Sequence, residues 1–276
     1  MPVHGTTPDS TTPPSRSLPS GFTLVELLVV VSILALLVAM LLPSLSGARD
    51  QAKAAVCASG IRQIALANTM YAGDHRQRYC PGAADLATTN LHRWHGTRDQ
   101  PGQPFRAAGG PLVPYLGSEQ GIRVCPSLRI GGSDADPAHF ERNCGGYGYN
   151  QAFLGRVLDP VGFGFFKLVT DRLGAMADRV RRPGQTVMFA DAAFAGAKLI
   201  EYSFAEPRRF PQFGGRPDPS IHFRHRGGAN VAWCDGHVDR RKRTFTWKSG
   251  FYPTDPDRLG IGWFGRLDDN SLFDLD

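Results

Sequence analysis

The side chains best suited to chemistry gather near the C-terminal end of the chain, in the stretch HFRHRGGANVAWCDGHVD. They are His222, His225, Asp235, His237 and Asp239, with Asp191 on an earlier β-rich segment that could lie beside them. Imidazole and carboxylate groups suit Zn²⁺ or another divalent ion. We take His222, His225, Asp235 and His237 as the metal-ligand candidates.

Two features argue against a metal there. The spacing matches no known zinc motif, and residues on either side of a tight turn alternate between the faces of a strand. A structural role is therefore favoured, in which Asp235 makes the turn and His225 caps the loop by hydrogen bonding. No nucleophile elbow or carboxylate pair indicates a hydrolase, so we expect no enzyme activity, no metal and no cofactor.

Five cysteines offer a second kind of chemistry: Cys57, Cys80, Cys125, Cys144 and Cys234. Cys125 and Cys144 flank a Gly-rich loop, and a disulfide between them would be worth roughly 3 kcal/mol by loop entropy. We expect this pair as a possible disulfide, although connectivity cannot be read from sequence and an odd count leaves one thiol over. No CxxC pair is present, so a zinc ribbon or a redox motif is not expected.

An acid within an apolar run is the third feature. In GFTLVELLVVVSILALLVAMLLP, residues 21 to 43, the segment from Phe22 to Leu42 is polar only at Thr23, Glu26 and Ser32, and it is long enough to span a bilayer as a helix. A charged side chain at membrane depth costs roughly 2.5–3.5 kcal/mol on insertion scales. A cleaved secretory signal would have a shorter apolar core followed by a small-residue site. The segment therefore predicts one membrane span, and the cost of Glu26 within it indicates that this acid has a function.

The residues GFTLVEL, followed by this span, resemble the processing site of type IV prepilins and type II secretion pseudopilins. The resemblance implies cleavage between Gly21 and Phe22, N-methylation of Phe22, and a salt bridge in the assembled filament between Glu26 and the Phe22 amine of a neighbouring subunit. Pro43 falls where many pilins place a proline that softens or kinks the helix.

The same resemblance implies partners and a location. The partners are a prepilin peptidase, other pilin or pseudopilin subunits, and an assembly platform with its ATPase. The chain would sit once through the cytoplasmic membrane, with its N-terminus in the cytoplasm and its C-terminal domain outside. One feature departs from the pattern of prepilin leaders, which usually carry several basic residues. Here the leader has a single Lys or Arg, Arg16, whereas three follow the span: Arg49, Lys53 and Arg62. The positive-inside rule alone would favour the opposite orientation.

A rival interpretation is a singly anchored envelope protein whose C-terminal sheet binds a ligand or a metal. Glu26→Ala separates the two, because it blocks assembly only in the filament interpretation. The net charge of +6 permits acidic partners but is also common in soluble ectodomains. Nucleic-acid binding is not expected, and we interpret the basic run at 240–243 as a solvated strand end.

The elements that must position these residues follow from periodicity and turn signals. Apolar or small residues recur every three or four positions beyond the span, at Leu45, Ala48, Ala52, Val56, Gly60, Ile64, Ala67 and Tyr71, and Gly73-Asp74 predicts the end of the helix. Strands are predicted at 186–191 and 197–204. Asp235-Gly236 predicts a hairpin with a two-residue type I′ turn.

The predicted fold is α+β and pilin-like: a long N-terminal helix packed on an antiparallel sheet of three to five strands with long loops. The predicted organisation is a leader at 1–21, a transmembrane helix at 22–42, its amphipathic continuation at 43–73, and an extracytoplasmic globular domain at 74–276.

The C-terminal half carries a second resemblance. His225, nine residues, and then Asp235-Gly236 resemble the H-X9-DG domain found behind prepilin-type N-termini in planctomycete-like bacteria, the DUF1559 group. CPS at 125–127, GGYGYN at 145–150 and PGQTVMFAD before the hairpin agree with it. The motif hairpin spans 225–236, and the resemblance implies a class of pilin-like proteins rather than a defined chemistry.

Overall fold

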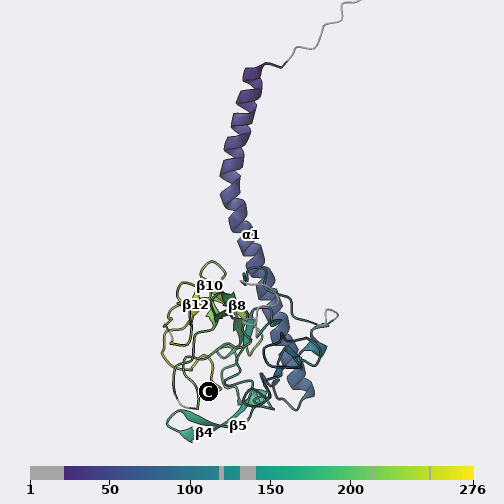
Figure 1. Ribbon diagram of the computed structural model, residues 1–276, viewed down its shortest axis with the longest axis vertical. Helices are drawn as coiled ribbons and strands as arrows, with labels where there is room; N and C mark the ends of the chain where they lie inside the picture. Colours follow the sequence, from purple (N-terminus) through teal and green to yellow (C-terminus); the bar gives the residue numbers. More distant parts are fainter. Residues whose placement is uncertain (1–21, 118–120, 131–140, 213, 249) are drawn as a thin grey trace, which may run out of the picture. The chain divides into compact units, whose positions relative to one another are not determined.

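The structure is a computed structural model that describes residues 22–117, 121–130, 141–212, 214–248 and 250–276 (Figure 1). The chain divides into two compact units, Met1–Gly47 and Ala48–Asp276. The predicted leader at 1–21, including Gly21, lies outside the described residues.

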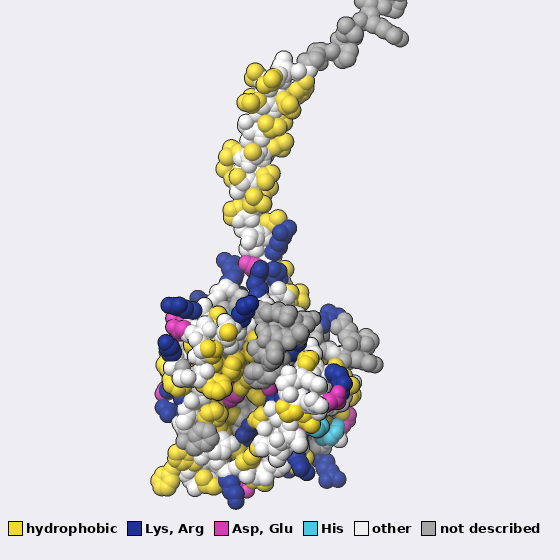
Figure 2. All heavy atoms as spheres, in the orientation of Figure 1, with side chains coloured by type: hydrophobic (Ala, Val, Ile, Leu, Met, Phe, Trp, Pro, Cys, Tyr) yellow, Lys and Arg dark blue, Asp and Glu magenta, His cyan; other side chains and the backbone are white. Residues whose placement is uncertain are grey.

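Helix α1 runs from Leu24 to Asp74 and ends at the predicted Gly73-Asp74 signal. Within the first unit its surface is apolar on all sides, and its large aliphatic side chains are exposed (Figure 2). Polar groups there are satisfied locally, since the hydroxyls of Ser32 and Ser44 donate to carbonyls of the preceding turn at 2.7 and 2.8 Å. Among the described residues, α1 is the one helix long and apolar enough to cross a membrane.

Pro43 lies inside α1. Because proline has no N–H, the helix loses one hydrogen bond at this position. The helix nevertheless continues through it, so the chain is helical on both sides of the proline.

The remaining elements are short strands and two 3₁₀ turns. In chain order they are β1 His92–Arg93, β2 Gly96–Thr97, η1 Val113–Tyr115, β3 Tyr147–Tyr149, β4 Val157–Gly162, β5 Phe165–Thr170, η3 Ala177–Arg179, β6 Val187–Asp191, β7 Phe194–Ala195, β8 Leu199–Ile200, β9 Ile221–His222, β10 Gly228–Trp233, β11 Val238–Lys242 and β12 Ile261–Gly262. Loops connect them, as the many glycines and prolines predict.

The main sheet has four antiparallel strands in the order β11-β10-β6-β3, which confirms the prediction of a small antiparallel sheet. Its central strands β6 and β10 are buried at every position. Side chains of β10 alternate between the two faces: Ala229, Val231 and Trp233 join one apolar cluster, whereas Ala232 joins the cluster beneath α1. The predicted strand at 186–191 is β6.

The second half of α1 packs on this sheet. The cluster between them contains Cys57, Ile61, Ile64, Ala65 and Ala72 of the helix with Tyr147, Tyr149, Met188 and Phe189 of the sheet. The predicted buried face was right at Ile64 and wrong at Val56, which is 53% exposed. The predicted face was chosen from the spacing of apolar and small residues. The buried face of the helix instead includes Cys57 and Asn68, and a polar residue such as Asn68 does not enter a count of apolar residues.

Gly60 has a packing reason to be glycine. A Cβ at this position would lie 2.9 Å from the hydroxyl oxygen of Tyr147. That hydroxyl also lies 3.5 Å from the Cys57 carbonyl, to which it donates. The helix accepts a poor helix former here because the tyrosine of β3 needs the space.

Two predicted elements differ in detail. The strand predicted at 197–204 is reduced to Leu199–Ile200, which pairs with β7 and not with the main sheet. The hairpin between β10 and β11 is present, but its turn is not type I′. Trp233 accepts from the Gly236 N–H at 2.9 Å, and only Gly236 has a positive φ, at +88°. The loop therefore has three residues, Cys234, Asp235 and Gly236, instead of the predicted two, and its last residue is a glycine in the left-handed conformation.

Candidate functional site

The N-terminal segment of α1 forms a capping box, T-x-x-E. Glu26 donates its backbone N–H to the Thr23 hydroxyl at 3.2 Å, and its carboxylate accepts from the Thr23 backbone N–H at 2.9 Å and hydroxyl at 2.7 Å. Both groups serve the free end of the helix, whose first N–H groups have no partners within the helix. Glu26 therefore has local hydrogen-bond partners in the isolated chain.

Phe22 precedes this cap and is 72% exposed. The motif in the sequence predicted roles in processing and assembly for Phe22 and Glu26 but none for Thr23. The T-x-x-E spacing, visible in the sequence, could have identified the cap.

The two ends of the H-X9-DG motif lie apart. His225 precedes β10 and Asp235-Gly236 follows it, so the six residues of the strand separate them. At about 3.3 Å per residue a strand of this length spans roughly 20 Å. The motif therefore does not form one site.

Asp235 has the predicted structural role. Its carboxylate accepts from the backbone N–H of His237 at 3.0 Å and contacts the His237 ring nitrogen Nδ1 at 2.6 Å. Burial raises the pKa of Asp235, but the hydrogen bonds and the nearby His237 together outweigh burial and lower the pKa. His237 stacks on Trp233 with ring centroids 5.6 Å apart, so the pair fixes the turn.

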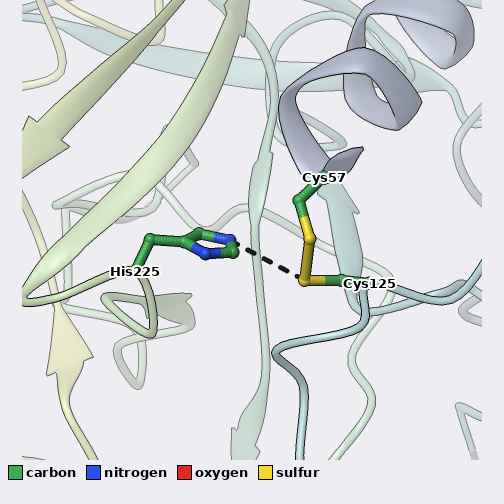
Figure 3. Close-up of side chains that lie close together, drawn as sticks. All are labelled: Cys57, Cys125 and His225. Carbon is green, nitrogen blue, oxygen red and sulfur yellow. Dashed lines mark hydrogen bonds between the residues drawn. A yellow bond between two sulfur atoms is a disulfide. The ribbon is translucent and has the colours of Figure 1, made fainter. Parts of the chain in front are cut away.

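His225 is not a loop cap, because its side chain enters the interior. Its Nε2 atom lies 3.1 Å from Asp191 Oδ2 and 3.7 Å from the Sγ atom of Cys125 (Figure 3). The chain can turn inward because His225 and Gly228 exchange backbone hydrogen bonds at 2.9 and 3.1 Å around a two-residue turn. Arg226 and Gly227 take positive φ values of 54° and 77° there, the pattern of a type I′ turn.

Asp191, at the end of β6, is the centre of this cluster. It accepts from Arg224 Nη2 at 2.7 Å and from the backbone N–H of Asn230 at 2.7 Å, besides its contact with His225. Burial alone would raise the pKa of Asp191, but Arg224, His225 and the Asn230 N–H outweigh it and lower the pKa. A carboxylate with this many partners stays ionised in the interior.

Arg224 connects the cluster to its surroundings. It donates to the carbonyl oxygens of Gly146 at 2.6 Å and Ala192 at 3.2 Å, and its Nε atom lies 3.2 Å from Cys125 Sγ. The sequence placed Asp191 near the histidines but did not single out Arg224, whose cation makes the buried carboxylate possible.

The disulfide joins Cys57 to Cys125, with Cα atoms 5.2 Å apart. The predicted Cys125–Cys144 pair is therefore wrong, since Cys144 is a buried free thiol. The loop between Cys125 and Cys144 made them neighbours in sequence, whereas folding brings Cys125 against the buried face of α1.

The metal-ligand candidates do not converge. His225 lies near Asp191 and the disulfide, whereas Asp235 and His237 form the turn at the other end of β10. His222, on β9, has Nδ1 3.3 Å from Arg224 Nη1, and burial, with the nearby Arg224, lowers the pKa of His222 to about 3. Cys57, Cys125 and His225 come within 4.8 Å of one another, but the disulfide removes both thiolates as ligands.

A second buried polar cluster was not predicted from the sequence. Arg93 and Glu141 form an ion pair at 2.6 Å with side chains 1% and 2% exposed. Ser203 donates to Glu141 at 2.5 Å, and its hydroxyl lies 2.8 Å from His95 Nε2. Burial, together with Arg93, lowers the pKa of His95 well below its ordinary value. No local motif marks these residues, because they come from three separate segments: the β1–β2 hairpin with Arg93 and His95, and the loops that carry Glu141 and Ser203.

The comparisons with known proteins point to the N-terminal segment. Residues 16–42 match the family described as "Prokaryotic N-terminal methylation motif", so the N-terminal segment carries a prepilin-like motif. A similar curated protein is "Type II secretion system core protein G" of Pseudomonas aeruginosa, 45% identical over 60 residues. This stretch covers 22% of the present chain and 42% of that relative. No solved structure matches the chain.

The family match ends at residue 42. The resemblance of the C-terminal half to an H-X9-DG domain therefore stays a prediction.

Proposed function

We propose that the chain is a prepilin-like structural subunit. A prepilin peptidase cuts it between Gly21 and Phe22 and methylates Phe22, and the mature chain assembles through α1 into a type II secretion pseudopilus or a type IV pilus-like filament. Its role is mechanical, with no catalysis of its own. Before assembly the chain is a single-pass protein of the cytoplasmic membrane, with its N-terminus inside and its globular domain outside.

One observation carries this proposal: an acid at Glu26, hydrogen-bonded in a capping box, at the start of an otherwise apolar helix within a matched methylation motif. The Thr23 cap satisfies hydrogen bonds of Glu26 but leaves its charge unneutralised. In a filament the Phe22 ammonium of a neighbouring subunit supplies the opposite charge, and intramembrane charges are tolerated when paired. The pairing would also set the stagger between subunits.

The 45% identity to a type II secretion core protein supports the pseudopilus over the pilus. Sister pseudopilins, an assembly platform and its ATPase are then the partners.

The test uses Glu26→Gln in cells that contain the peptidase and the assembly machinery. Glutamine keeps an oxygen that can accept from Thr23, so the helix cap survives while the charge is lost. We expect normal cleavage and loss of sheared filaments on electron micrographs. Ser32→Ala is the matched control, because it removes a polar group from the same helix without removing a charge. Undiminished filament yield from Glu26→Gln would contradict the assembly role.

A further inference from the structure

A small hollow of about 250 Å³ lies in the second unit beside the start of its helical segment. Lys53 of α1, Arg129, Arg224, His225 and Arg226 line it, and Asp50 is its acidic residue. Lys and Arg side chains gather on this part of the second unit in Figure 2. The lining is therefore cationic and polar rather than apolar.

Three of these cations have no ion-pair partner among the described residues. Within the described part of the chain, Lys53, Arg129 and Arg226 form no ion pair. Elsewhere in the second unit, Arg209 and Arg216 share Asp268 at 2.9 and 2.8 Å. Because these cations outnumber the single acid of the hollow, Asp50, they repel one another, and a bound anion relieves that repulsion.

Arg226 is held at the hollow by an unfavourable backbone conformation. Its φ of +54° lies in the left-handed region, which costs a residue with a Cβ roughly 1 kcal/mol. Asn or Gly is the usual choice at this position of a type I′ turn. An arginine here indicates that the guanidinium has a use, since strained positions gather at functional sites.

A second observation that indicates a bound ligand is a buried side-chain nitrogen with no hydrogen-bond partner among the described residues. His225 is 2% exposed and lines the hollow. Its Nε2 atom contacts Asp191, while its Nδ1 atom has no hydrogen-bond partner among the described residues. Buried polar atoms are nearly always satisfied, so a polar ligand in the hollow would complete the site.

We infer that this hollow binds a phosphate group. Convergent Arg and Lys donors match phosphate geometry, and the volume is below that of most drug-sized sites, which suits a small headgroup. Two sources carry this chemistry: an anionic lipid and free phosphate. Lys53 follows Leu42, the last residue of the predicted span, by eleven residues, so a lipid headgroup is within reach of the chain. The lipid source rests on the proposed membrane anchoring, and the free-phosphate source does not.

The experiment uses the full chain in a maltoside detergent and in nanodiscs. The first arm titrates inorganic phosphate and measures heat and the shift in thermal midpoint, which rises with ligand that binds only the folded state. The second arm compares retention of phosphatidylglycerol and phosphatidylcholine by native mass spectrometry. The variants are Arg129→Gln and Arg226→Asn, the latter because Asn tolerates the positive φ of the turn. Arg62→Gln, an exposed arginine of α1 outside the hollow, is the matched control.

Each variant should weaken phosphate affinity about tenfold, the usual worth of a charge-assisted hydrogen bond, while Arg62→Gln binds as the wild type. Preference for phosphatidylglycerol assigns the lipid source, and saturable phosphate binding without lipid preference assigns the free anion. No binding in either arm, or equal binding by the variants and the wild type, overturns the inference. Cleavage before Phe22 is measured on the same samples, so a failure of processing is recognised separately from a failure of phosphate binding.

Discussion

Removing the Cys57–Cys125 disulfide should destabilise the globular unit severely. The bond joins residues 68 positions apart, and loop entropy for a closed loop of this length amounts to about 4 kcal/mol at 25 °C. Alanine at both positions keeps the interior apolar, so this loss dominates. For a unit of this size it lowers the thermal midpoint by roughly 8–16 °C.

The assay is urea and thermal unfolding of the full chain in detergent, followed by circular dichroism. Cys144→Ala is the matched control, because Cys144 is buried, free and the partner that sequence alone suggested. It should cost about 1 kcal/mol of packing. Peptide mapping without reduction identifies the bonded pair directly. A double-alanine variant that melts within about 2 °C of the wild type would refute the entropy argument, and a loss with Cys144→Ala equal to that with Cys57→Ala would refute the connectivity.

Three further predictions concern packing and charge. Gly60→Ala should lower the free energy of unfolding in the wild type, because the new Cβ would lie 2.9 Å from the Tyr147 hydroxyl. In a Tyr147→Phe background, which lacks that hydroxyl, the same change should raise the free energy of unfolding by up to about 1 kcal/mol. A double-mutant cycle measured by urea unfolding that shows no coupling between the two positions would contradict this. The pKa of His222 is about 3 when folded and about 6.5 when unfolded. Below pH 6.5 the unfolded chain therefore takes up the proton first, and stability falls by about 2 kcal/mol between pH 7 and pH 5; His222→Gln should flatten this slope, and an unchanged slope would exclude His222 as its cause. Glu141→Gln breaks a fully buried ion pair and should cost about 3–5 kcal/mol, against less than about 1 kcal/mol for Asp99→Asn in an exposed pair; equal costs in denaturant titrations would count against the buried pair.

Local signals in the sequence predicted those parts of the fold that depend on local interactions. The end of α1 at Gly73-Asp74, strand β6 and the β10–β11 hairpin follow from turn chemistry and periodicity. The type of turn did not follow, because Asp-Gly is compatible with more than one loop length.

Contacts between distant segments were harder to predict. The partner of Cys125 is on α1, and cysteine spacing holds no information about which surfaces meet. The buried face of the helix was misplaced near Val56, because Ala54, Cys57 and Ile61 turn inward there instead. A count of apolar residues also missed Asn68, a polar core residue whose side-chain oxygen accepts from the backbone N–H of Cys80 at 2.9 Å. The sequence grouped Asp191 with the histidines, but the cation that stabilises it, Arg224, has no motif of its own.

The most direct test of the prepilin account is the mass and N-terminal sequence of the full chain expressed with and without a prepilin peptidase. The account predicts a mature chain that begins at methylated Phe22 only when the peptidase is present, with the precursor intact in its absence. A chain that stays uncut with the peptidase, or that is cut elsewhere, would contradict the account and favour a singly anchored envelope protein.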